Sequence, residues 1–180
     1  ESGAQVHHRD EFLRLEWPAS EESQGAIEFD LSGEHPLFTQ LSLTASGVEH
    51  ILARQADPVT FLTVGSREGR PEAGWVIFFD KVWKRPFQTH RAELHLNEAR
   101  VICRGNRTTV AFGELEAGSF HGELHVTVYR DTALVRVEAV LRTEEERRAI
   151  LYDVGLVSDD SCWTSSASKQ VRVGARRTAQ

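Results

Sequence analysis

The chain has 180 residues, of which 40% are hydrophobic and 27% charged, a composition typical of one soluble globular domain. Its formal net charge of −6 disfavours general binding to nucleic acid or to an anionic membrane. No apolar run approaches the roughly 20 residues that span a bilayer, so we expect no membrane insertion. The sequence contains no methionine, which indicates a removed leader or a longer parent chain.

The first half of the chain alternates between apolar and polar residues, the pattern of half-buried β-strands. After a loose polar terminus, residues 12–17 place Leu13, Leu15 and Trp17 on one face. Further strands are predicted at residues 26–31, 37–43 and 59–64, and residues 48–52 are ambiguous. The apolar run at residues 75–79 predicts a strand that is buried on both faces.

The second half contains the longest clean alternation, from residue 119 to residue 156. Leu124, Val126 and Val128 form its apolar face, residues 135–141 continue that face after a short turn, and residues 149–152 add a third apolar segment. We expect this stretch to be the central sheet of the domain. Before it, residues 87–96 predict one ten-residue strand, and residues 100–103 and 108–112 predict a hairpin.

No segment shows a sustained helical period. The one helical candidate is residues 143–149, at most two turns long, where Thr143 and Glu146 match a capping box; the alternative is a simple charged turn. Roughly ten to thirteen short strands at regular spacing predict an all-β fold, a two-sheet antiparallel β-sandwich. We expect the sandwich to cover residues 1–157. Residues 158–180 are then a polar tail or linker, or the start of a further region, with a short strand candidate at 170–173.

The two cysteines leave two alternatives open. Cys103 lies in an apolar strand, where an inert buried thiol is the usual outcome. A disulfide between Cys103 and Cys162 would instead close a long loop and stabilise the fold by about 4 kcal/mol.

No strong catalytic or phosphate-binding motif is present, so candidate sites rest on weaker clusters. The leading candidate is the charged loop that contains Asp80, Trp83 and Arg85, together with His90 on the following strand. An exposed indole offers a flat apolar surface to a sugar ring, and neighbouring charged groups can bond its hydroxyls. The alternative is that Trp83 packs over the end of the sheet while the charges are solvated.

The second candidate is the polar face of one strand, with His121, Glu123, His125 and Tyr129. It would form the floor of a sugar-binding cleft, or else a plain solvated face. His121 and His125 would lie about 13 Å apart along a strand, too far to share one metal ion. We therefore predict no metal site and no cofactor.

The residues Gly118-Ser119-Phe120, the strand ending in Tyr129 and the segment LVRVEAVLRTEE at 134–145 resemble strands of galactose mutarotase-like sandwiches. The resemblance covers about 40 residues. It implies a supersandwich of that type or part of one. Such sandwiches occur as accessory or substrate-cleft domains of glycoside hydrolases and polysaccharide lyases, and as stand-alone aldose epimerases.

Together these observations predict a secreted or periplasmic carbohydrate-binding or accessory domain, non-catalytic alone, whose ligand is an oligosaccharide or polysaccharide. One alternative is a carbohydrate-active enzyme, an epimerase, lyase or hydrolase, with a histidine–carboxylate pair on a concave sheet face. Another is a structural module that joins further domains or a second copy through its edge strands. That alternative predicts a large apolar patch and no polar-lined cleft.

Overall fold

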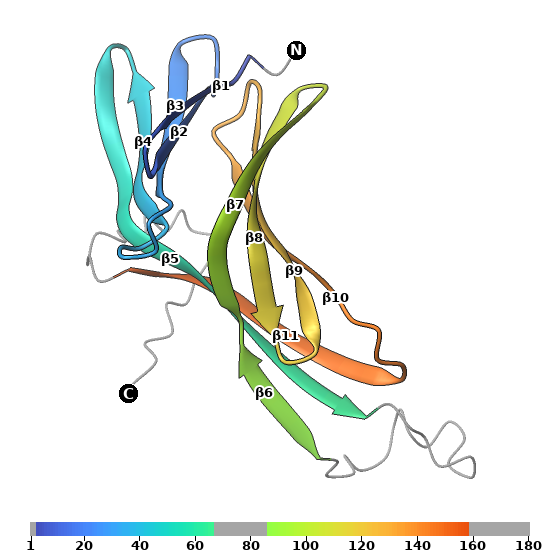
Figure 1. Cartoon of the computed structure of the whole chain (residues 1–180). Helices are drawn as coiled ribbons and strands as arrows, with labels where there is room; N and C mark the ends of the chain where they lie inside the picture. The colour runs from blue at the N-terminus through green and yellow to red at the C-terminus, as the bar shows by residue number, and fades with distance from the viewer. Residues whose placement is uncertain (1–2, 67–85, 159–180) are drawn as a thin grey trace, which may run out of the picture.

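The computed structural model describes residues 3–66 and 86–158, and the chain is all-β in these ranges. Its strands form two antiparallel sheets that face each other (Figure 1), which confirms the predicted two-sheet β-sandwich. The strands are β1 (Gln5–Arg9), β2 (Phe12–Pro18), β3 (Ser23–Asp30), β4 (Phe38–Ala45), β5 (Val48–Ser66), β6 (Phe87–Arg91), β7 (Glu93–Arg104), β8 (Arg107–Ala117), β9 (Phe120–Tyr129), β10 (Val135–Arg142) and β11 (Arg148–Ser158).

The smaller sheet has four strands in the order β10-β9-β8-β7, so each strand pairs with its neighbour in the chain. The predicted hairpin is confirmed, because β7 and β8 turn back at Gly105, which has a φ of 61°. The larger sheet has the order β1-β2-β3-β4-β5-β11, and β6 pairs with β5 off this path.

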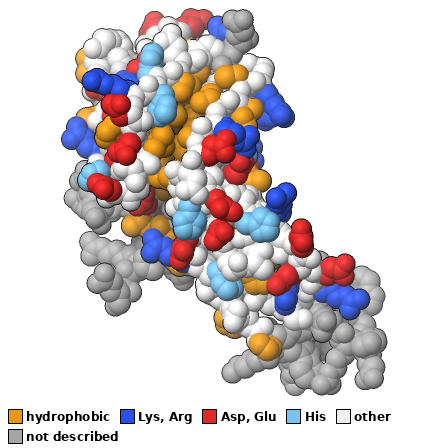
Figure 2. Space-filling view, viewed as in Figure 1, with side chains coloured by type: hydrophobic (Ala, Val, Ile, Leu, Met, Phe, Trp, Pro, Cys, Tyr) orange, Lys and Arg blue, Asp and Glu red, His pale blue; other side chains and the backbone are white. Residues whose placement is uncertain are grey.

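The core lies between the two sheets and is built from the alternating apolar residues. Phe29 of β3 contacts Phe38 of β4, with ring centroids 5.4 Å apart, and Phe112 of β8 in the opposite sheet at 5.0 Å. The tilted pair of Phe29 and Phe112 joins the two layers, while the pair of Phe29 and Phe38 lies within the larger sheet. Figure 2 shows apolar side chains between the layers, bordered by charged and histidine side chains. The most deeply buried apolar residues include Leu15, Trp17, Ile27, Phe29, Val110, Phe112, Leu124, Val126 and Val128.

One strand, β5, belongs to two different parts of the larger sheet. Its first half pairs with β4, and its second half pairs with β6 on the same edge and β11 on the other. We call the second half of β5, together with β6 and β11, the arm; Figure 1 shows it extending below the rest of the sandwich. A small second core of Leu62, Ala117 and Phe120 joins the arm to the turn between β8 and β9.

Of the two alternatives for residues 143–149, the helix is wrong and the charged turn is what the structure shows. Residues 143–147 form an irregular connection, in which Thr143 Oγ1 accepts a hydrogen bond from the Glu145 N–H, and β11 begins at Arg148. An isolated helix of at most two turns is not stable without a packing face. The third apolar segment also lies elsewhere than predicted, because β11 pairs with β5 in the larger sheet and not with β10.

Two further expectations are corrected within the described ranges. The single strand predicted at residues 87–96 is divided at Ala92, where the chain passes from β6 in one sheet to β7 in the other. Cys103 is exposed, not buried, because it lies near the end of β7 at the edge of the smaller sheet. Cys162, the strand candidates at 75–79 and 170–173, and the predicted tail beyond Ser158 lie outside the described residues. No helix in the described ranges is long and apolar enough to cross a membrane.

Candidate functional site: a cleft between the sheets

The edge of β5 that carries β4 and β6 has a gap between these two partners. The β4 pairing ends at Ala56, and the β6 pairing begins at Phe61. Pro58 lies in the gap and has no N–H to offer to a neighbouring strand. The larger sheet is therefore open at residues 57–60 of β5.

Two hydrogen bonds from other parts of the chain partly close this gap. Asp57 Oδ1 accepts a hydrogen bond from the backbone N–H of Leu37 at 2.7 Å, and the Thr60 carbonyl accepts one from the Ala92 N–H at 2.8 Å. The first bond anchors the segment before β4, and the second anchors the point where the chain changes sheets. Both fix groups that line the opening.

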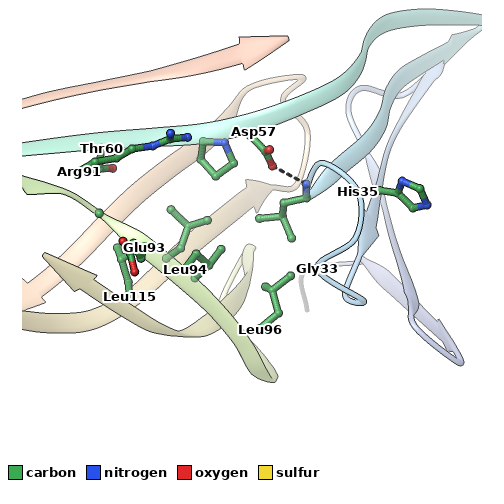
Figure 3. A pocket seen from close by; sticks show the side chains of 13 residues that line it. Gly33, His35, Asp57, Thr60, Arg91, Glu93, Leu94, Leu96 and Leu115 are labelled. Atoms are coloured by element: carbon green, nitrogen blue, oxygen red, sulfur yellow. Dashed lines mark hydrogen bonds between the residues drawn. The ribbon is translucent and has the colours of Figure 1, made fainter. Parts of the chain in front are cut away.

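A cleft of about 370 Å³ lies at this gap, between the two sheets. Figure 3 shows the side chains that surround it, among them Leu94, Leu96 and Leu115 and the polar residues Asp57, Thr60, Arg91 and Glu93. Its volume is at the lower end of the range for small-molecule sites. The apolar lining comes from Leu37, Leu94, Leu96, Leu115 and Leu124, and the polar lining from Asp57, Thr60, Arg91 and Glu93, with His35 at one end.

The polar side chains of the cleft differ in whether they already have hydrogen-bond or ion-pair partners within the protein. Asp57 is half-buried and holds the Leu37 N–H, so one of its oxygens is already used. Arg91 and Glu93 are exposed, and neither side chain has a hydrogen bond or ion pair with another described residue. His35 points away from the other lining side chains in Figure 3. The cleft thus presents a cation and a carboxylate, free of described partners, above an apolar floor.

The outer face of the smaller sheet carries a second polar cluster. His125 Nε2 lies 2.9 Å from Glu123 Oε2, and Arg100 donates a hydrogen bond to the other oxygen of Glu123. The hydrogen bond with His125, followed by that from Arg100, lowers the pKa of Glu123 from its ordinary value of 4.5. The hydrogen-bonding groups of these three side chains are therefore used within the cluster itself.

A similar group lies beside it on the same face. Arg136 Nη2 is 2.5 Å from Glu138 Oε1, and a hydrogen bond with Tyr129, followed by the charge of Glu138, raises the pKa of Arg136. Both clusters are held by internal contacts on an open face. They offer fewer uncommitted groups to a ligand than the cleft does.

The binding-site residues predicted from the sequence lie in different parts of the chain, and some of them are outside the described ranges. Asp80, Trp83 and Arg85 lie outside the described residues. His90 is half-buried, and its ring lies against Gly118 in the turn between β8 and β9, so it packs at the joint of the arm. His121 and His125 do lie on the polar face of β9, as the alternation predicted, opposite Arg142 and Glu138 of β10.

Sequence reasoning missed the cleft. Asp57, Arg91 and Glu93 belong to three different strands, and no spacing in the chain indicates that they meet. One available signal was Pro58 inside an apolar alternation, because proline in a strand marks an edge or an interruption in pairing. A catalytic enzyme would need a histidine–carboxylate pair, and His125 and Glu123 are such a pair within hydrogen-bonding distance, but both residues lie outside the cleft.

No group of three or more histidine, cysteine or acidic side chains within the described ranges is arranged to hold a metal ion. No protein-family model, curated protein or solved structure matches the chain.

Proposed function

We propose that this chain is a carbohydrate-binding or accessory β-sandwich domain of a polysaccharide-processing protein, non-catalytic alone, and that the cleft between the sheets binds part of the glycan. The observation that carries the proposal is the pairing of an apolar leucine floor with Arg91 and Glu93 at the mouth. A sugar ring has the matching chemistry, with apolar C–H faces and hydroxyls around its rim. The galactose mutarotase-like resemblance supports the same ligand class.

The size and charge of the cleft indicate which kind of glycan it would bind. About 370 Å³ accommodates one or two sugar rings, not a long segment of a chain. An arginine binds carboxylates through two parallel hydrogen bonds, so Arg91 favours an acidic sugar over a neutral one. The nearby Glu93 can accept hydrogen bonds from hydroxyls, which orients the ring.

A thermal-shift screen against neutral and acidic polysaccharides tests the proposal. A ligand that binds only the folded state raises the melting temperature. We expect a hit among glycans that contain uronic acids, with no hydrolysis, elimination or epimerisation of the glycan. Turnover of the glycan would instead support the alternative of an enzyme.

Titration of variants with the identified glycan then locates the site. Arg91→Ala and Glu93→Gln should each weaken binding, by about tenfold for the loss of a charge-assisted hydrogen bond. Arg104→Ala is the matched control, because Arg104 is an exposed arginine on the same strand as Glu93 but at its far end. Unchanged affinity in both cleft variants would exclude the cleft.

Two more variants distinguish the cleft from the site predicted by sequence. Trp83→Ala and His90→Ala test the charged loop and the strand that follows it. If glycan affinity falls in Trp83→Ala but not in Arg91→Ala, the glycan binds at the loop. If it falls in both, the loop and the cleft form one site.

A further inference from the structure

The strand β11 has the composition of a buried strand but is exposed along almost its whole length. Between Arg148 and Ser158 its one charged residue is Asp153, and every residue except Ser158 is exposed. Leu151 and Tyr152 keep 74% and 76% of their surface accessible. Near-continuous apolar strands normally lie in the middle of a sheet, covered on both faces.

Both faces of β11 and one of its edges are open. Tyr152 and Val154 lie on the face that continues from Leu62, while Leu151 lies on the opposite face, which Phe61 shares. One edge pairs with β5 along all eleven residues of β11. The other edge ends the larger sheet, and no described strand pairs with it. An edge of this length and apolarity is a template for another strand.

We propose that β11 pairs antiparallel with β11 of a second copy of this chain, about a two-fold axis at Val154. This register places Tyr152 opposite Leu156 of the second copy, and Leu151 opposite Val157. Aromatic–aliphatic and aliphatic pairs of this kind stabilise antiparallel strands. The one internal charge, Asp153, lies opposite Gly155, where it meets no side chain.

The neighbouring symmetric registers are less favourable. An axis at Asp153 would place two carboxylates directly opposite each other, which is destabilising. An axis at Tyr152 would place Asp153 opposite Leu151, and an axis at Gly155 would place it opposite Val157, so each would bring a charge against an apolar side chain. The charge pattern of β11 therefore selects the register at Val154.

The exposed apolar area is of the size that a dimer needs. The side chains involved are Phe61, Ile150, Leu151, Tyr152, Val154, Leu156 and Val157. With side-chain areas on the order of 150–200 Å², their exposed fractions leave roughly 600–700 Å² on each copy. Standard interfaces bury about 800 Å² per partner, and here the apolar area is divided between the two faces of the arm that flank the open edge.

The test is the mass of the full chain in solution, measured by analytical ultracentrifugation over a wide range of concentration. We expect the wild type to be a dimer. Val154→Lys and Val154→Glu should each be monomeric, because the axis brings two like charges face to face. Val154 is 57% exposed, so both variants should fold, and circular dichroism with thermal unfolding checks this.

Mixing the two variants provides the decisive measurement. Lysine from one chain then faces glutamate from the other, so the equimolar mixture should form a heterodimer while each variant alone stays monomeric. Val101→Lys is the matched control, because Val101 is an exposed valine on β7, the edge strand of the other sheet. It should leave the dimer intact. A monomeric wild type, a dimeric Val154→Lys variant or a mixture that stays monomeric would each overturn the proposal.

Discussion

The indole ring of Trp17 lies directly over Gly25, the residue opposite it on the neighbouring strand. A Cβ atom at Gly25 would lie 2.3 Å from Cζ2 of the indole. The ring is held in this position, because its Nε1–H donates a hydrogen bond to the Thr132 carbonyl at 2.8 Å and the side chain is buried. The position therefore requires glycine for reasons of space.

Substitution of Gly25 by alanine should destabilise the sandwich by about 1–3 kcal/mol, the cost of overpacking a rigid core. The free energy of unfolding in urea measures this, and the loss of the Trp17 hydrogen bond should also change the tryptophan fluorescence. Gly65→Ala is the control, because a Cβ there meets its nearest atom at an ordinary 3.6 Å. Equal stability of the two variants would contradict the packing described for Trp17.

The carboxylate of Asp57 acts in place of a strand partner for the Leu37 N–H. Asp57→Ala removes the acceptor and leaves a donor beside a buried leucine without a bond, which costs about 1–3 kcal/mol. Asp57→Asn keeps an amide oxygen that can accept the same bond, so most of the stability should remain. Urea unfolding of the two variants compares them, and a similar loss in both would show that the negative charge of Asp57 matters more than the hydrogen bond.

The hydrogen bonds to Glu123 predict a pH-dependent contribution to stability. Because its pKa is lower in the folded state, the unfolded chain binds the proton more readily, and acidification favours unfolding. The contribution is fully present above the ordinary pKa of 4.5 and is lost as the pH falls through the lowered value. Since Glu123 is one-third exposed, we expect less than about 1 kcal/mol.

Glu123→Gln tests this, because glutamine cannot titrate. The difference in unfolding free energy between wild type and Glu123→Gln should be largest near neutral pH and should shrink below pH 4.5. A difference that stays constant across the acid range would show that Glu123 has the same pKa in the folded and unfolded states.

Because His90 contacts Gly118, we expect the stability losses of substitutions at these two positions not to be additive. A Cβ at Gly118 would lie 2.8 Å from His90 Nε2, and the residue has a φ of 63°. Gly118→Ala should therefore lower the free energy of unfolding for two reasons, the steric clash with His90 and roughly 1 kcal/mol of backbone strain. In the His90→Ala background only the strain remains, so the double variant should be more stable than the sum of the two losses predicts. Additive losses would place His90 away from the turn.

The sequence predicted strand positions well wherever one face of a strand is covered. Leu124, Val126 and Val128 are buried as the alternation required, and so are Leu13, Leu15 and Trp17. A period of two residues specifies which face is apolar, but it contains no information about which sheet a strand joins. This is why β11 was assigned to the wrong sheet and why the passage from one sheet to the other at Ala92 was not foreseen.

The cleft could not be predicted for a related reason. It forms where β4 stops pairing and β6 has not yet begun, which is a property of three-dimensional pairing along β5 and leaves no local pattern in the chain. Arg91 and Glu93 are ordinary charged residues of an alternating segment. They acquire a common location only because the chain changes sheets between them.

The pairing of β5 with β11 has a consequence for how the chain folds during synthesis. Ala56 pairs with Ser158, which follows it by 102 positions in the chain. The second half of β5 can therefore pair with β11 only after β11, the last described strand, has left the ribosome. Contacts so distant in sequence form slowly. A nascent chain that ends before β11 exposes one edge of β5, the longest of the described strands, and this intermediate is the form on which a chaperone or a misfolded neighbour would act.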